Sequence, residues 1–178
     1  MRLLGIDGCR GGWAVAESDE SLSAVRFSLA CDIGALLDAA DPASTLVAID
    51  MPIGLPHDGP RACDRAARAF LRAPRGSSVF PAPTRTALPA LDYAAACGLN
   101  LEACGRSLSR QAFAIFPKLR AVDSVLTPDR QHWIREAHPE VTFAALAGAG
   151  RGLASAKRLP AGRAERLGLL ARHLPDLT

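Results

Sequence analysis

Apolar positions in the first thirty residues follow the short runs and alternation that β-strands produce. Residues 2–7 and 13–16 are apolar runs separated by the pair Gly11-Gly12. Residues 24–30 alternate in side-chain character. These three segments predict an antiparallel meander whose first turn is tight.

Helical spacing begins after the meander. Asp32 is a predicted N-cap, and apolar residues then recur at helical spacing until Asp41-Pro42 ends the helix. The prolines and glycines of residues 51–60 exclude a regular element and predict a loop. The composition of residues 61–72 predicts a second helix.

The second half of the chain reads mostly as short helices. Residues 74–89 are rich in Pro, Ser and Arg and predict an exposed loop, while residues 90–127 predict two or three short helices. A helix is predicted to open at Pro139, its first helical position, and to run to about residue 147. Residues 148–152 predict a flexible link, and residues 163–173 a final helix.

Two further strands complete the predicted sheet. Residues 46–49 are apolar without alternation, which is typical of a parallel strand covered on both faces, and residues 133–137 are a short strand candidate. Right-handed crossovers place the fourth strand beside the first. The fold class predicted is therefore α/β, an RNase H-like mixed sheet of order 3-2-1-4-5 with helices on both faces.

Length and composition bound the class of protein. A chain of 178 residues that is 49% hydrophobic is enough for one domain, residues 1–178, with a sizeable core. The sequence shows neither a signal-peptide pattern nor an apolar stretch near the ~20 residues that span a bilayer. We therefore expect a cytoplasmic protein with no membrane partner.

The five cysteines lack zinc-like spacing and predict reduced thiols. The oligomeric state is left open, a homodimer included.

Charge is distributed unevenly along the chain. Residues 1–50 hold three basic and eight acidic side chains, for a net charge of −5. Residues 51–178 hold eighteen basic and ten acidic side chains, for a net charge of +8. A localised positive field predicts a polyanionic partner, and nucleic acid is the main candidate.

Two carboxylates stand where the predicted strand order reverses. Asp7 ends the first strand and Asp50 ends the fourth. Sites in open α/β sheets form outside the carboxyl ends of strands at such a reversal. Neighbouring strands lie ~4.8 Å apart, so the two carboxylates can share a divalent ion, and oxygen ligands favour Mg²⁺ or Mn²⁺. The alternative interpretation is that each Asp only caps a turn.

The segment after the fifth strand supplies a third set of candidate groups. Strand alternation points Glu136 and His138 to the same side, and Glu140 follows on the first helical turn, so all three can reach one cleft. The alternative interpretation is that Glu140 only stabilises the helix N-terminus and that His138 is an N-cap or turn residue. Lys157, in the late link, is a further candidate for proton transfer or phosphate binding.

An arginine stripe follows the loop that leaves Asp50. Its members have the spacing i, i+4, i+7 and i+11 and share one helix face: Arg61, Arg65, Arg68 and Arg72. They are candidate phosphate contacts, and the alternative is a solvated face. The predicted buried face of this helix consists of Cys63, Ala66, Ala67 and Phe70, with Asp64 at pairing distance from the stripe. The adjoining turns and loops add Arg10, Arg75, Ser77 and Ser78.

At these residues the sequence resembles the DUF429 family of predicted RNase H-like nucleases. The matching blocks span nearly the whole chain in order: residues 5–13 (GIDGCRGGW), 49–56 (IDMPIGLP), Arg61 with 63–65 (CDR), 77–81 (SSVFP), Pro117-Lys118 with Val122-Asp123, and 136–141 (EAHPEV) with Phe143. The last but one of these blocks adds Lys118 to the candidate substrate-binding residues.

The resemblance implies a metal-dependent nuclease and strengthens the assignment of Asp7, Asp50, Glu136, His138 and Glu140 to the site. It also implies a last helix with an acidic motif Asp-x-x-Asp-Ala that would complete the metal site. No such motif follows residues 173–176 before the last residue, 178. Either the sequence is truncated or the helix is absent, and in both cases we expect the remaining metal ligands to come from Glu136 and Glu140.

Three functions are compatible with these features. The first is a metal-dependent phosphodiesterase that acts on nucleic acid and holds one or two Mg²⁺ or Mn²⁺ ions. The second is a non-catalytic nucleic-acid-binding module with the same fold, which the missing acidic helix favours. The third is an actin-like nucleotide phosphohydrolase or phosphotransferase, because Asp7-Gly8 with Gly11-Gly12 loosely resembles a phosphate-binding hairpin.

Overall fold

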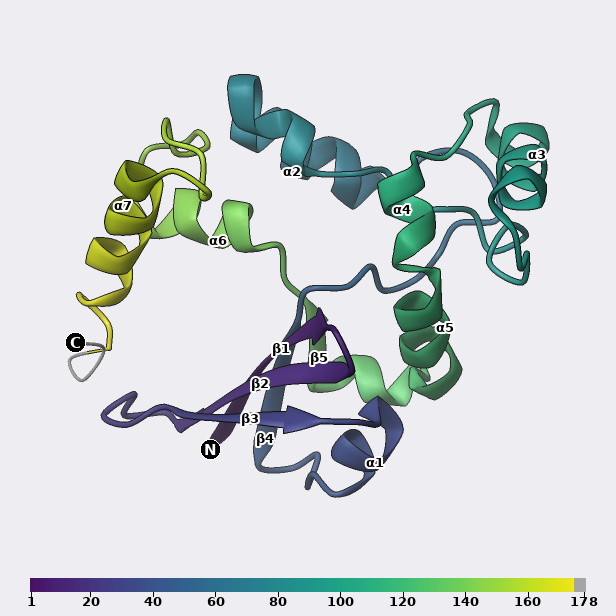
Figure 1. The fold of residues 1–178 in the computed structure, drawn as a ribbon. Helices are drawn as coiled ribbons and strands as arrows, with labels where there is room; N and C mark the ends of the chain where they lie inside the picture. The colour runs from purple at the N-terminus through teal and green to yellow at the C-terminus, as the bar shows by residue number, and fades with distance from the viewer. Residues whose placement is uncertain (175–178) are drawn as a thin grey trace.

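The computed structural model describes residues 1–174 and contains one mixed β-sheet. The three strands that open the chain run antiparallel to one another: β1 (Arg2–Cys9), β2 (Gly12–Asp19) and β3 (Arg26–Ala30). Strands β4 (Thr45–Ile49) and β5 (Ile134–Glu136) continue the sheet in parallel on the other side of β1. The order β3-β2-β1-β4-β5 confirms the predicted α/β class and strand order (Figure 1).

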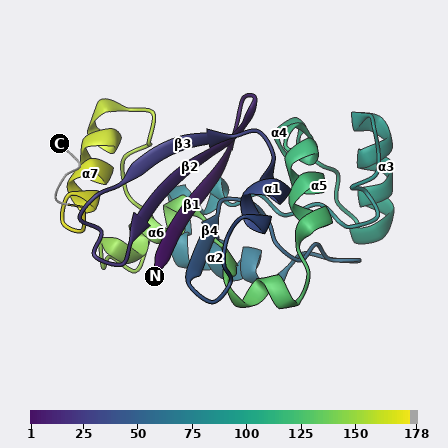
Figure 2. The same cartoon turned by 90° about the horizontal axis from the view of Figure 1, so that it is seen from below.

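Helices fill the connections between the strands. They are α1 (Ile33–Asp38), α2 (Ala62–Arg75), α3 (Tyr93–Cys104), α4 (Arg110–Ala114), α5 (Phe116–Val125), α6 (Pro139–Leu146) and α7 (Pro160–Leu170), with 3-10 turns η1 (Gly76–Ser78) and η2 (Asp129–His132). In both ribbon views α6 and α7 lie on one side of the sheet, and α3, α4 and α5 lie on the other (Figures 1 and 2). Within residues 1–174, no helix is long and apolar enough to cross a bilayer.

One face of the sheet carries the main core. Strand register aligns Leu4 with Val47 and Ile6 with Ile49, and all four side chains are buried. They pack in one cluster with apolar residues of α1 and α5: Ile33, Leu37, Phe116, Leu119 and Val122. Burial of these aliphatic and aromatic side chains is the main stabilising term.

The opposite face of the sheet is lined by small residues and lies partly open. Gly5 pairs with Ala16 and with Ala48 across the neighbouring strands. A groove of about 620 Å³ runs over this face, and α6 and α7 border it through Phe143, Leu146 and Leu170. Strand β3 adds Phe27 and Leu29, which are 73% and 78% exposed.

Two predictions about helix α2 and its neighbourhood were wrong. The residues of the helix that are buried are Asp64 and Leu71, beside the buried N-cap Arg61, whereas Cys63 is exposed. An ion pair between Arg61 and Asp64 lets both charged side chains enter the interior, which spacing of apolar residues does not reveal. The segment 74–89, predicted as an exposed loop, is helical up to Ser78 and has five buried residues beyond it: Val79, Pro83, Thr84, Ala87 and Leu88. The Thr84 amide donates to the Asn100 side chain at 2.8 Å.

Candidate active site

A cleft of about 530 Å³ lies at the carboxyl ends of β1, β4 and β5. It collects side chains from the strand ends, helices α2, α4 and α5, and the loop before α7. Among the candidates it gathers Asp7, Asp50, Glu136, His138, Glu140, Lys157, Arg61, Arg75, Ser78 and Lys118, and it adds Asp64 and Arg158. Arg10, Arg65, Arg68 and Ser77 do not line it. The apolar groove shares Asp7 and Asp50 with the cleft, so the two hollows meet at these carboxylates.

Asp7 and Asp50 lie on adjacent strands at the same level. Ile6 pairs with Ile49, and the Asp50 amide donates to the Ile6 carbonyl at 2.9 Å, so the next residue of each strand follows in register. Within residues 1–174 neither carboxylate has an ion-pair partner. Burial raises the pKa of Asp50, the charge of Asp7 raises it further, and His138 and Lys157 oppose this rise.

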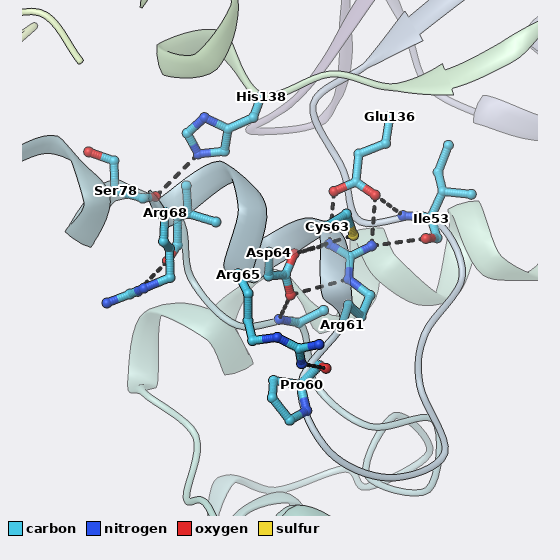
Figure 3. Close-up of polar contacts among 12 residues, drawn as sticks. Ile53, Pro60, Arg61, Cys63, Asp64, Arg65, Arg68, Ser78, Glu136 and His138 are labelled. Carbon is cyan, nitrogen blue, oxygen red and sulfur yellow. Dashed lines mark hydrogen bonds and ion pairs between the residues drawn. The ribbon is translucent and has the colours of Figure 1, made fainter. Parts of the chain in front are cut away.

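Glu136 reaches the cleft but is already paired. Its oxygens accept from Nη1 and Nη2 of Arg61 at 2.7 and 2.8 Å, and one of them also accepts from the Ile53 amide at 2.9 Å (Figure 3). The strand register explains the position of Glu136. It pairs with Ile49, the residue before Asp50, and successive side chains of a strand point to opposite faces. The Glu136 side chain therefore leaves the sheet on the face opposite to that of Asp50.

Arg61 is the centre of a buried charge cluster at the start of α2. Its Nε donates to Asp64 at 3.2 Å, and Asp64 also accepts from the Ala82 amide at 3.0 Å (Figure 3). Burial alone would lower the pKa of Arg61, but its bonds to Glu136 and Asp64 outweigh burial and raise the pKa above its ordinary value. The cluster joins the start of α2, the end of β5 and the loop at Ala82. The guanidinium of Arg61 is hydrogen-bonded to these protein groups.

Glu140 is likewise occupied. Nη2 of Arg166 donates to both of its carboxylate oxygens, at 2.8 and 2.7 Å, and both side chains are buried. The pair joins the first turn of α6 to α7. A carboxylate held in this way by two hydrogen bonds from one guanidinium is neutralised by the protein itself.

His138 lies between the carboxylates and the α2 wall. Its Nε2 is 3.3 Å from the Ser78 carbonyl, a partner that accepts a hydrogen bond (Figure 3). With the proton on Nε2, the imidazole leaves Nδ1 as a lone pair. Nδ1 is buried and has no partner among residues 1–174.

Most of the candidate arginines bond backbone carbonyls. Arg65 donates to Pro60 and Arg68 to Val79, both at 2.7 Å, outside the cleft (Figure 3). Arg75 lines the cleft, but its guanidinium donates to the Leu153 and Ala154 carbonyls, each at 2.8 Å. These bonds give the arginines structural roles whatever else they contact.

Lysines and Arg158 divide into bound and available cations. Lys118 donates to the Gly12 carbonyl at 2.5 Å and sits 4.5 Å from the centre of the Trp13 ring. Lys157 and Arg158 are exposed and, in the part of the chain that the structure describes, have no hydrogen-bond or ion-pair partner. Among the described residues, the charged side chains of the cleft that have neither a hydrogen-bond nor an ion-pair partner are therefore Asp7, Asp50, Lys157 and Arg158.

The carboxylates fit one divalent ion better than two. Within residues 1–174, no group of three or more His, Cys, Asp or Glu side chains is arranged to hold a metal. Mg²⁺ is commonly held by one or two carboxylates and completes its shell with waters and substrate phosphate, which matches Asp7 with Asp50. Glu136 and Glu140 would have to leave their arginines to become ligands.

Comparison with known proteins places the chain in a family. The family model DUF429, described as a protein of unknown function, matches residues 5–178. The chain belongs to the DUF429 family. No curated protein and no solved structure matched it significantly. For this DUF429 chain, what the site does must therefore be argued from its own residues.

Sequence reasoning missed two residues that line the DUF429 cleft, Arg158 and Asp64, and one that holds a carboxylate of the cleft, Arg166. Arg158 directly follows Lys157, so the basic pair is a usable signal. The sequence places Arg166 only within the final helix, which starts at Pro160, three residues earlier than predicted. Asp64 had been placed near Arg61, but its bond to the Ala82 amide has no local sequence signal.

Proposed function

We propose that this protein is a metal-dependent phosphodiesterase that hydrolyses nucleic acid in the cytoplasm. The observation that carries the proposal is the pair Asp7 and Asp50, two adjacent carboxylates that have no ion-pair partner within residues 1–174, in the same cleft as Lys157 and Arg158. Two carboxylates this close favour a bound cation, and free basic groups beside them favour an anionic substrate.

The residues of the cleft then divide the chemistry. Asp7 and Asp50 would hold one Mg²⁺ or Mn²⁺ ion, which supplies a Lewis acid and an activated water for attack on phosphorus. Lys157 and Arg158 bind the phosphate oxygens from the opposite wall. His138, which lines the cleft near Asp50, would take part in proton transfer during the reaction.

A polymeric substrate agrees with the charge of the chain. The cleft is built mainly from the part of the sequence with a net charge of +8, and uncompensated basic groups bind phosphates through release of counterions. Binding should therefore weaken as salt rises. Each cation that contacts a phosphate contributes about one unit to the slope of log affinity against log salt.

The deciding test is cleavage by carboxylate variants. Labelled single-stranded, duplex and branched DNA and RNA are incubated with Mn²⁺ or Mg²⁺ and with wild type, Asp7→Asn, Asp50→Asn and Asp129→Asn. Asp129 is an exposed residue of η2 outside the cleft and serves as the matched control. We expect cleavage by wild type and Asp129→Asn, and loss of cleavage in both cleft variants. Equal cleavage by all four proteins would refute the proposal.

A non-catalytic nucleic-acid-binding module is the second candidate. The pairing of Glu136 with Arg61 and of Glu140 with Arg166 favours it, because these pairs leave only two free carboxylates for a metal. This function predicts salt-sensitive binding that survives Asp7→Asn and weakens in Lys157→Met and Arg158→Met, with no cleavage product from any protein. Metal-dependent cleavage by wild type removes it.

A further inference from the structure

Lysine is rare in this chain and confined to the cleft. Of 21 basic residues other than histidine, only Lys118 and Lys157 are lysines. Both line the cleft, from different walls. Lys118 is engaged by the Gly12 carbonyl and the Trp13 ring. Lys157 is the lysine whose ammonium remains available to a ligand.

The segment before Lys157 is hydrogen-bonded to two helices. Three consecutive carbonyls each accept from an arginine of another element. Arg75 of α2 donates to Leu153 and Ala154, and Arg166 of α7 donates to Ser155 at 3.1 Å. The Gly152 amide also donates to the Leu71 carbonyl at 2.8 Å. Lys157 therefore stands two residues beyond a backbone fixed from two sides.

Two glycines allow this close packing. A Cβ on Gly162 would lie 2.1 Å from the Ala156 carbonyl oxygen, beside Lys157. A Cβ on Gly152 would lie 2.3 Å from Cβ of Arg75. Neither contact tolerates an added methyl group without movement of the 152–157 segment. Gly168, on the same helix α7 as Gly162, has no atom within 4 Å of such a Cβ.

Arg166 links this segment to the other side of the site. The guanidinium that holds Ser155 also holds Glu140, which follows His138 by two residues. One buried ion pair thus sets the position of Lys157 relative to His138 and Asp50. A shift of about 1 Å in such a group is enough to lower a rate considerably.

We infer that Arg166 and Arg75 are positioning residues, which place Lys157 so that its ammonium contacts the phosphate oxygen next to Asp7 and Asp50. The inference rests on the proposed phosphodiesterase function, in which Lys157 and Arg158 bind phosphate, and adds the contacts that fix Lys157 in the site. An ammonium is a compact point charge with three donors, so it can approach one oxygen where the larger planar guanidinium cannot.

The first test observes the lysines directly. Reductive ¹³C-methylation retains lysine charge and gives side-chain signals from Lys118 and Lys157, which Lys118→Arg and Lys157→Arg variants assign. We expect Gly162→Ala to move the Lys157 signal and leave the Lys118 signal in place. Gly168→Ala, the matched control, moves neither. If Gly162→Ala leaves the Lys157 signal unchanged, or moves both lysines alike, the positioning inference is overturned.

The second test adds inorganic phosphate as the probe. Titration should shift the Lys157 signal of the wild type in a saturable manner. The shift should be lost in the double variant Glu140→Leu with Arg166→Met, which removes the ion pair without leaving a buried lone charge. A wild-type shift confined to Lys118, or an undiminished Lys157 shift in a folded double variant, would overturn the inference.

The third test separates the inference from the proposed function. In a cleavage assay, Lys157→Met should raise KM roughly 10-fold to 100-fold, as expected for loss of a hydrogen bond to a charged group. Lys157→Arg should recover part of this loss. Asp-dependent cleavage with an unchanged KM in Lys157→Met would overturn the inference and leave the phosphodiesterase intact. Phosphate binding at Lys157 without any cleavage would overturn the phosphodiesterase function and leave the inference about Lys157 intact.

Discussion

Arg61 and Glu136 are joined by two hydrogen bonds, 2.7 and 2.8 Å long, across 75 residues of sequence. The bonds fix the start of α2 to the end of β5. They also give Glu136 a role that does not require a metal. The glutamate supports the cleft wall and holds the Ile53 amide in the loop that leaves Asp50.

Removal of Arg61 should destabilise the protein strongly. Arg61→Met leaves Asp64 buried without its cation and breaks the bonds to Glu136, and loss of one partner of a buried ion pair costs about 3–5 kcal/mol. Urea unfolding monitored by tryptophan fluorescence measures the change. Arg65→Met is the control, because Arg65 is exposed and bonds only the Pro60 carbonyl, and it should cost less than about 1 kcal/mol. Similar losses in both variants would contradict the structural role of the cluster.

The pKa of Asp50 should change when a single neighbouring charge is removed. Asp7→Asn removes a negative charge and should lower the pKa of Asp50, whereas Lys157→Met removes a positive charge that opposes the rise and should raise the pKa. Carboxyl ¹³C NMR titration in metal-free buffer measures these shifts. Asp129→Asn should leave the Asp50 titration unchanged. An Asp50 pKa that ignores Asp7→Asn would mean that the two carboxylates do not interact.

Asp50 should also reduce stability at neutral pH. Because its pKa is higher in the folded than in the unfolded chain, the folded state binds more protons between the two values. The stability contributed by protonated Asp50 is present below its ordinary pKa of 3.8 and is lost as the pH rises through the folded value. Asp50→Asn should therefore raise Tm at neutral pH and have little effect near pH 3.

Asp41 serves as the comparison, because its replacement by Asn should change Tm at neutral pH in the opposite direction. The Ser44 hydroxyl and the Ala43 amide lower the pKa of its carboxyl. Its contribution is present above the ordinary value of 3.8 and is lost as the pH falls. Asp41→Asn should lower Tm at neutral pH. Equal signs for the two variants would contradict the assignment of Asp50 as a destabilised carboxylate.

Gly12 should be required for folding rather than for nucleotide binding. It has φ of +157°, and a Cβ there would lie 2.2 Å from the Ala30 carbonyl oxygen. Gly12→Ala should cost about 1–3 kcal/mol in urea unfolding. Gly98→Ala, in α3 with open space around it, should stabilise the protein by about 0.5–1 kcal/mol.

The same turn bears on the actin-like hypothesis. If Gly11-Gly12 held nucleotide phosphates, ATP with Mg²⁺ would raise Tm of the wild type by mass action. We expect no such rise, because the close packing of Gly12 against the Ala30 carbonyl already accounts for the glycine. A saturable ATP-dependent rise would restore that hypothesis.

The sheet was predictable because its signals are local. Apolar runs placed β1 and β4, and the residue after each apolar run gave Asp7 and Asp50 directly. Partners of the other carboxylates depend on contacts distant in sequence. Nothing near Glu140 indicates Arg166, which lies 26 residues later, so the sequence assigned a metal-ligand role to a carboxylate that the protein pairs internally.

The contacts that build the cleft have a consequence for folding. β1 and β2 pair through a tight turn, but the Ile53 amide meets Glu136 across 83 residues, and Arg75 meets Ala154 across 79. Long-range contacts close large loops and form late. We therefore expect the meander to become protected from hydrogen exchange first and the cleft last. On mild destabilisation the order reverses, so activity should disappear while most of the sheet is still intact.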